Sequence, residues 1–147
     1  TRLNYTILGD SVNLASRLEG LNKVYGTSII TSEEVQMIAA EDFHFRILDR
    51  VAVKGRRQGG TIYELVCPVS EASKEQFELA QMHEAALDEY IQGNFEQALK
   101  SFNGIRSLAP EDAPSQILVS RCEDLIAHPP TEWDGVISID RNIRDNG

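Results

Sequence analysis

An amide and a guanidinium stand four residues apart near the start of this chain, at Asn13 and Arg17. Residues four apart lie on the same face of a helix, so these two side chains would rise together if the segment is helical. A guanidinium forks onto phosphate oxygens, and the pair would therefore suit a phosphorylated ligand. The alternative, from spacing alone, is the ordinary solvated face of a surface helix.

The segment around this pair predicts a strand, a glycine turn and an amphipathic helix. Residues 3–8 alternate loosely and include Tyr, Thr, Ile and Leu, which favours a half-buried strand. Gly9 allows a sharp turn, and Asp10 is a suitable N-cap for a helix that begins at Ser11. The apolar stripe of that helix consists of Leu14, Leu18 and Leu21. The stripe predicts packing against a sheet, with the polar pair beside it.

A longer pattern surrounds these residues and reads Tyr-Thr-x-x-Gly-Asp-x-Val-Asn-x-Ala-Ser-Arg-Leu-Glu over residues 5–19. It resembles the signature of the class III nucleotidyl cyclases, the catalytic domain of adenylyl and guanylyl cyclases. The resemblance continues through Tyr25-Gly26, residues 28–32, residues 51–55 (Val-Ala-Val-Lys-Gly) and residues 62–65 (Ile-Tyr-Glu-Leu). It covers about residues 1–66, slightly under half of the chain.

The resemblance implies roles for four residues. Class III cyclases form cyclic nucleotides by attack of the ribose 3′-hydroxyl on the α-phosphate, which expels pyrophosphate. By resemblance, Asn13 would orient the ribose, Arg17 would stabilise charge at the α-phosphate, and Lys54 would contact the terminal phosphates. A purely structural lysine is the alternative for Lys54. Thr6 matches the position that reads the purine, and a hydroxyl there can donate to N1 of ATP or accept from its amino group, which favours ATP without deciding it.

The resemblance also implies a metal cofactor and a dimeric partner. The two metal-binding aspartates of the family and its purine-reading lysine lie upstream of the matched segment, so Mg²⁺ or Mn²⁺ is expected with its ligands in a missing upstream half. Asp10 belongs to the start of a helix, and no metal ligand is assigned in this chain. In this family the active site forms across a dimer interface. The resemblance therefore implies a second cyclase domain as partner, supplied by a homodimer. The chain is therefore expected to be a fragment of a longer protein and to be inactive in isolation.

The remainder of the first half predicts an α+β fold. A short β-branched strand is expected over residues 27–31, after Gly26 has ended the first helix. Ser32 with two following glutamates predicts an N-cap and a helix to about Ala40. His44 is expected as a solvated strand residue rather than a catalytic base.

Two further strands complete this half. The segment over residues 43–48 alternates as a strand, residues 51–53 continue or restart it, and residues 56–60 predict a hairpin turn into a strand over residues 61–66. The order strand-helix-strand-helix-strand-strand is similar to the C-terminal half of a ferredoxin-like cyclase domain.

The second half predicts a small all-α extension over residues 74–128, joined through a polar linker over residues 67–73. Helices are expected over residues 74–92, 95–108 and 114–126. The spacing of Ala98, Phe102 and Pro110 resembles the second helix of a tetratricopeptide repeat. One repeat and a following helix are too short for a solenoid, so a capped helical hairpin is expected. Residues 129–147 are expected as a polar tail in which Trp133 docks on the helices.

Charge is divided unevenly between the two halves. Residues 1–66 carry eight Lys/Arg and eight Asp/Glu, whereas residues 67–147 carry six and fifteen, which supplies the whole net charge of −9. The acidic half argues against nucleic acid or an anionic membrane as its partner. Cys67 and Cys122 stand far apart and are expected as reduced thiols. No apolar run approaches a membrane span, so a cytoplasmic chain is expected, with any membrane anchor of the parent upstream.

Three hypotheses for function result. The first is a part of an adenylate cyclase that converts ATP to 3′,5′-cyclic AMP and pyrophosphate in intracellular signalling. The second is a non-catalytic regulatory cyclase homologue or a guanylate cyclase; the presence of Asn13, Arg17 and Lys54 argues against a degenerate site. The third is a helical protein-interaction module, with a protein partner for residues 74–128.

Overall fold

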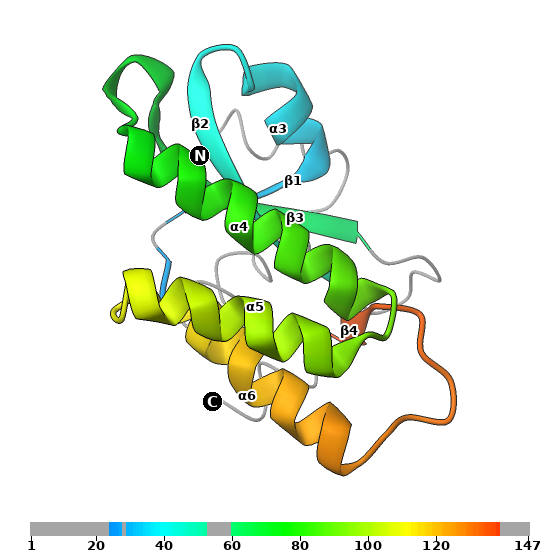
Figure 1. Ribbon diagram of the computed structural model, residues 1–147. Coiled ribbons are helices and arrows are strands. Elements are labelled where there is room, and N and C mark those ends of the chain that lie inside the picture. The colour runs from blue at the N-terminus through cyan, green and yellow to red at the C-terminus, as the bar shows by residue number, and fades with distance from the viewer. Residues whose placement is uncertain (1–23, 28, 53–59, 139–147) are drawn as a thin grey trace.

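A computed structural model describes residues 24–27, 29–52 and 60–138 of the chain (Figure 1). The strand expected over residues 3–8, most of the helix expected from Ser11, and the hairpin turn before Gly60 lie outside these ranges. Within them, the order is strand-helix-strand-strand, then three long helices and a short last strand. The elements are β1 (Ile30–Ser32), α3 (Glu33–Ala39), β2 (Phe43–Ala52), β3 (Gly60–Pro68), the 3-10 turn η1 (Val69–Glu71), α4 (Lys74–Ile91), α5 (Phe95–Leu108), α6 (Ala113–Ala127) and β4 (Ile137–Ser138).

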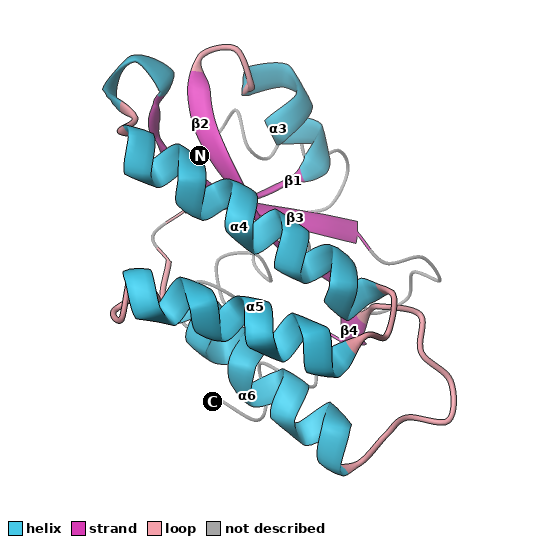
Figure 2. Ribbon diagram, viewed as in Figure 1, coloured by secondary structure: helices cyan, strands magenta, loops and turns pink. Residues whose placement is uncertain are grey.

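The strands form one sheet in the order β1-β3-β2-β4. β3 pairs antiparallel with both β1 and β2, which confirms the expected hairpin pairing, and β4 pairs parallel with the end of β2. Helix α4 packs across β2, α5 packs against α4, and α6 packs against α5 (Figures 1 and 2). The α+β fold class is therefore confirmed for the part of the chain that the structure describes.

Local capping explains where the helices begin. Ser32 caps α3 by accepting from the amide of Val35 at 3.4 Å, as its position before two glutamates predicts. Ser73 and Gln76 form a capping box at α4, in which each side chain accepts from the other residue's backbone amide. α5 has the bounds expected from the sequence, and it ends before Pro110.

Strand β2 contains a bulge that changes which residues face inward. His44, Arg46 and Leu48 are buried in alternation, but the register shifts between Ile47 and Asp49, and Asp49 is buried as well. The expectation that His44 is solvated is wrong, because its ring is buried against Phe77 of α4, with ring centroids 4.5 Å apart. The inner face of β2 thus carries two charged side chains and a histidine.

The segment between the sheet and the helices is not an extended linker. Residues 67 and 68 belong to β3, and η1 follows directly, with the amide of Val69 donating to the carbonyl of Asp42 at 2.9 Å. The division of the chain into domains at this segment stays a prediction, as does the tetratricopeptide-like character of the helices.

One hydrophobic core runs from the sheet into the helices. Its largest fully buried apolar side chains come from both parts: Tyr25, Leu48 and Val51 from the sheet side, and Leu87, Tyr90, Phe102, Ile105 and Leu118 from α4–α6. Trp133 docks on this core as expected, since its indole N–H donates to the carbonyls of Tyr90 and Ile91, both at 3.0 Å. The segment after α6 then adds β4 to the sheet, which the expectation of a polar tail did not include.

Candidate functional site

The four residues singled out in the sequence, Thr6, Asn13, Arg17 and Lys54, lie outside the described residues. The structure describes the residues that follow Arg17 from Val24 onward and those that precede Lys54 up to Ala52. Val24 and Tyr25 are helical, and Gly26 follows with φ +65°, a left-handed conformation that ends the helix as expected. β2 runs to Ala52, two positions before Lys54 in the sequence.

Gly26 is also a point of close approach to the helical region. A Cβ atom added at this glycine would lie 2.5 Å from the Cβ of Ala113, the first residue of α6. A side chain at this position would therefore meet both an unfavourable backbone conformation and a steric clash. The Tyr25-Gly26 part of the cyclase-like pattern thus packs directly on the helical extension.

The first buried polar cluster is centred on Asp49, whose side chain has no exposed surface. One carboxylate oxygen accepts from the hydroxyl of Tyr25 at 2.6 Å and forms an ion pair with Nη1 of Arg121 on α6. The other oxygen accepts from the backbone amide of Arg50 at 2.7 Å. The guanidinium of Arg121 also lies 6.0 Å from the ring centroids of both Tyr25 and Tyr90, within range of a cation–π contact.

The second buried cluster joins Arg46 of β2 to Asp112 and His83. The guanidinium makes a two-pronged contact with the carboxylate of Asp112, at 2.5 and 2.7 Å, and its Nη2 lies 2.9 Å from Nδ1 of His83. Asp112 is also the N-cap of α6, accepting from the amide of Ser115 at 3.1 Å. Strand β2, helix α4 and the start of α6 therefore meet at one guanidinium.

The protonation of His83 follows from its two neighbours. A guanidinium can only donate, so Nδ1 accepts from Arg46 and the ring proton must sit on Nε2, which donates to the carbonyl of Leu48 at 3.1 Å. Complete burial, together with the charge of Arg46, lowers the pKa of His83 from its ordinary 6.5 to about 3. The imidazole is therefore neutral at physiological pH and fully engaged, which suits a structural role rather than proton transfer.

Electrostatics in these clusters stabilise the charged forms of the ion-pair partners. Burial raises the pKa of Asp112, but the hydrogen bonds and charge of Arg46 outweigh that effect and hold the pKa below its usual range. Burial, followed by the nearby carboxylate of Asp49, raises the pKa of Tyr25 well above its ordinary value, so this phenol stays protonated and donates. Every charge in the two clusters has an opposite partner, and together they fasten the helices to β2.

The described residues also include two cysteines and possible metal ligands. Burial raises the pKa of Cys122 to about 11, which leaves this thiol protonated and unreactive, and neither Cys67 nor Cys122 forms a disulfide. Where the structure is described, no group of three His, Cys, Asp or Glu side chains could hold a metal ion. None of the helices that the structure describes is both long enough and apolar enough to cross a bilayer.

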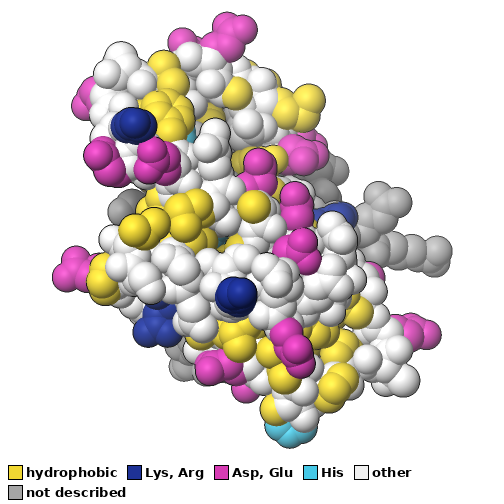
Figure 3. Space-filling model, in the orientation of Figure 1, with side chains coloured by type: hydrophobic (Ala, Val, Ile, Leu, Met, Phe, Trp, Pro, Cys, Tyr) yellow, Lys and Arg dark blue, Asp and Glu magenta, His cyan; other side chains and the backbone are white. Residues whose placement is uncertain are grey.

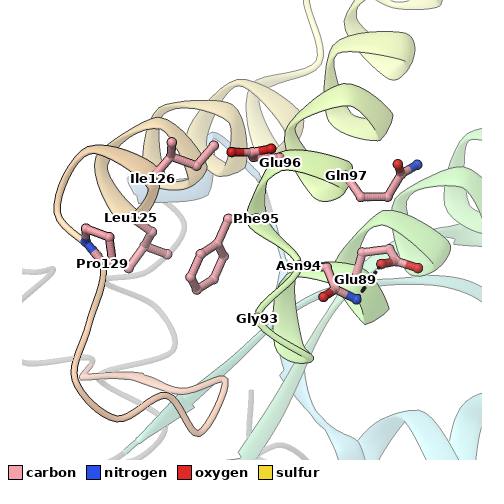
Figure 4. Close-up of a pocket in the computed structure, with 9 residues that line it drawn as sticks. All are labelled: Glu89, Gly93, Asn94, Phe95, Glu96, Gln97, Leu125, Ile126 and Pro129. Atoms are coloured by element: carbon pink, nitrogen blue, oxygen red, sulfur yellow. Dashed lines mark hydrogen bonds between the residues drawn. The ribbon is translucent and has the colours of Figure 1, made fainter.

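An open hollow of about 500 Å³ lies where α4 ends, α5 begins and α6 ends (Figure 4). Phe95 projects into it, Leu125, Ile126 and Pro129 form one wall, and the α4–α5 turn at Gly93 forms the other. Glu89 and Glu96 stand at its edge, and the carboxylate of Glu89 accepts from the side-chain amide of Asn94 at 2.9 Å. The described lining of the hollow is mixed: apolar side chains of Phe95, Leu125, Ile126 and Pro129 lie beside the polar ones of Glu89, Asn94, Glu96 and Gln97.

Sequence reasoning missed the two buried clusters. Arg121 stood in the expected helix among Ile117, Leu118 and Leu125, and a charged residue among these apolar ones is the signal that could have indicated a buried ion pair. Its partner could not be named in the same way, because the burial of Asp49 depends on the bulge in β2.

Comparison with known proteins points to one class, the adenylate cyclases. The chain is 32% identical over 125 residues to the adenylate cyclase, terminal-differentiation specific, of Dictyostelium discoideum, an alignment that covers 82% of this chain and 6% of that protein. It is 49% identical over 65 residues to adenylate cyclase 1 of Rhizobium meliloti (strain 1021), which covers 44% of this chain and 10% of that protein. It is 43% identical over 68 residues to an adenylate cyclase of Anabaena cylindrica, covering 44% and 14%.

These similarities support an adenylate cyclase family for the chain. The chain spans no more than 14% of the length of these relatives. No family model matches it, and no solved structure matches it. The Dictyostelium alignment is longer than residues 1–66, so it must include part of the helical region as well as the cyclase-like segment.

Proposed function

We propose that this chain is the C-terminal part of a class III adenylate cyclase domain, continued by a helical extension, in a protein that converts ATP to 3′,5′-cyclic AMP and pyrophosphate. The observation that carries the proposal is the pattern over residues 5–19, which places an amide and a guanidinium four residues apart. Similarity to three proteins named adenylate cyclase supports it.

In this proposal the chain supplies positioning and charge for phosphoryl transfer. Asn13 orients the ribose so that its 3′-hydroxyl faces the α-phosphate, and Arg17 stabilises the negative charge that develops there as pyrophosphate leaves. Lys54 holds the terminal phosphates, and Thr6 contacts the purine. The nucleotide is shared with a second cyclase domain, in a homodimer.

The metal of the proposed reaction is assigned to the longer polypeptide. Mg²⁺ or Mn²⁺ would be held by carboxylates upstream of the matched segment, as the class III resemblance implies. The described residues include no cluster that fits such an ion. No step is therefore assigned to the metal through the side chains of this chain.

The test is the turnover of the full-length polypeptide with and without Arg17. Arg17→Ala is expected to lower kcat for cyclic AMP formation by about two to three orders of magnitude, as removal of a donor to a transition state does. Arg106→Ala, an exposed arginine on α5, is the matched control and should leave kcat unchanged. Undiminished turnover of Arg17→Ala would refute the assignment.

The same assay separates the alternatives. Cyclic GMP from GTP, in preference to cyclic AMP from ATP, would make the protein a guanylate cyclase. Binding of ATP without turnover would indicate a regulatory homologue. If the protein neither binds ATP nor turns it over, the interaction module is favoured. The hollow around Phe95 is then the surface to examine.

A further inference from the structure

The hollow around Phe95 lies where the ends of three helices meet. α4 ends at Ile91, α5 begins at Phe95 and α6 ends at Ala127, and residues from all three ends line it (Figure 4). Its volume of about 500 Å³ falls within the range of about 300–1,000 Å³ that is usual for binding pockets. The proposed cyclase reaction uses none of the residues in its described lining.

The apolar part of the hollow is supported by an aromatic cluster. The ring centroid of Phe95 lies 5.1 Å from that of Trp133 and 6.3 Å from that of Tyr90. Trp133 is itself held in place, because its indole N–H donates to the carbonyls of Tyr90 and Ile91. An apolar surface that is fixed before a ligand arrives loses little conformational entropy on binding.

The charged side chains at the hollow are all of one sign. Its described lining includes two carboxylates, those of Glu89 and Glu96, and no lysine or arginine. The side-chain amide of Asn94 holds the carboxylate of Glu89 at 2.9 Å (Figure 4). Neither glutamate forms an ion pair with a residue that the structure describes, so both can pair with a cation from outside.

The helix ends add to this negative charge. α4 and α6 both end at the hollow, and neither has a basic residue in its last turn. The carbonyl end of a helix is equivalent to roughly half a negative elementary charge. The positive end of α5 has Glu96 in its first turn, which offsets it. The hollow therefore favours a ligand that is both cationic and partly apolar.

We propose that this hollow binds a peptide segment of a partner protein in which a large apolar side chain stands next to Lys or Arg. The apolar side chain packs on Phe95, Leu125 and Ile126, and the neighbouring cation pairs with Glu89 or Glu96. A hollow that is open to solvent covers one side chain rather than a whole small molecule, which favours a peptide over a free amine. The inference is independent of the cyclase reaction.

The test is a calorimetric titration of the full-length polypeptide with acetylated and amidated peptides that have Leu or Phe between two lysines. Matched peptides have glutamate in place of the lysines, or alanine in place of the apolar residue. The lysine-flanked peptides should bind saturably, and at least about tenfold more tightly than either matched set. The absence of saturable binding by every lysine-flanked peptide up to about 1 mM would overturn the proposal.

Two double variants with the same change of net charge test the role of the carboxylates. Glu89→Gln with Glu96→Gln removes the charges at the hollow and should weaken binding about tenfold. Glu75→Gln with Glu78→Gln removes two exposed charges near the start of α4 and should weaken binding less than about twofold. Equal weakening would mean that the peptides are attracted to acidic surface in general, which would overturn the site.

A second pair of variants tests the apolar wall. Ile126→Gln should weaken binding of the leucine peptide about fivefold, because it replaces an apolar contact with a polar one. Ile38→Gln, at an exposed isoleucine of α3, is the control and should change binding less than about twofold. Equal effects of the two variants would contradict the assigned contact.

Photo-crosslinking locates the peptide without any substitution in the protein, and so covers the case in which a variant does not fold. A peptide with benzoylphenylalanine in place of leucine should crosslink within residues 93–97 or 125–129, as mapped by mass spectrometry. Crosslinks confined to other segments would refute the site. Binding of lysine amide as tightly as of the peptides would make the ligand a small organic cation and would refute the peptide.

Discussion

The sheet and the helical unit of this chain differ in where they carry charge. β2 carries Arg46 and Asp49 on its buried face, whereas α4–α6 carry most of their charges on the outside, and Figure 3 shows acidic side chains spread over the face that α4 and α5 form. The charged partners of β2, Asp112 and Arg121, are the exceptions in the helical unit, because both side chains are nearly buried. The helical unit therefore completes the sheet electrostatically as well as covering it.

The largest expected effect comes from removing the helical partner of Asp49. Arg121→Met keeps an apolar stem but leaves a buried carboxylate without its counter-charge, which should lower the free energy of unfolding by about 3–5 kcal/mol. Urea unfolding measures this loss. Arg106→Met, on the exposed face of α5, is the control and should change stability by less than about 0.5 kcal/mol. Similar losses in the two variants would mean that the Arg121–Asp49 ion pair does not stabilise the fold.

A smaller effect is expected from acid, through His83 at the junction of the two regions. Its pKa is about 3 in the folded protein and near 6.5 when unfolded, so between these values the unfolded chain binds a proton that the folded chain does not. Stability should therefore fall as pH falls from 6.5 toward 3, by about 2–3 kcal/mol at pH 4.5 from this residue alone.

The variant that isolates this contribution is His83→Gln, which cannot titrate. The difference in unfolding free energy between pH 7 and pH 4.5 should shrink in His83→Gln and persist in His128→Gln, an exposed histidine. The depressed pKa of Asp112 contributes in a lower window, since its stabilisation is lost only as pH falls through its folded pKa. An unchanged pH dependence in His83→Gln would show that His83 is not held buried in its neutral form in the folded protein.

The smallest effect belongs to a feature confined to the helical unit. Ser73→Ala removes the N-cap of α4 and should lower the free energy of unfolding by about 1 kcal/mol. Ser120→Ala, an exposed position within α6, should cause no loss because alanine favours a helix. Urea unfolding of both variants would show whether local capping contributes less than the ion pairs between the two regions.

Local signals allowed much of the fold to be predicted. Ser32 before two glutamates, and the run from Phe95 to a break before Pro110, gave helix boundaries because capping and proline act on neighbouring residues. Which side chains of β2 face the core could not be predicted after Ile47, since the bulge at Leu48 depends on the register of β2 with β3. His44 was misjudged for a related reason, because its burial depends on Phe77 of α4.

The candidate site divides in the same way. Asn13, Arg17, Thr6 and Lys54 follow from a pattern of neighbouring residues and stay predictions, since they lie outside the described residues. The pairing of Asp49 with Arg121 joins residues that are distant in the chain, and no local pattern indicates such a pair. The sequence shows that a charged residue lies in a helix, but it does not identify the residue with which that charge forms an ion pair.

The position of α6 late in the chain has a consequence for synthesis on the ribosome. Arg46 and Asp49 leave the exit tunnel before Asp112 and Arg121 have been translated. During that interval the inner face of β2 cannot shed its water without burying the carboxylate of Asp49 before its counter-charge Arg121 is present. The nascent sheet must therefore stay hydrated until α6 emerges, and the two regions acquire their final packing together.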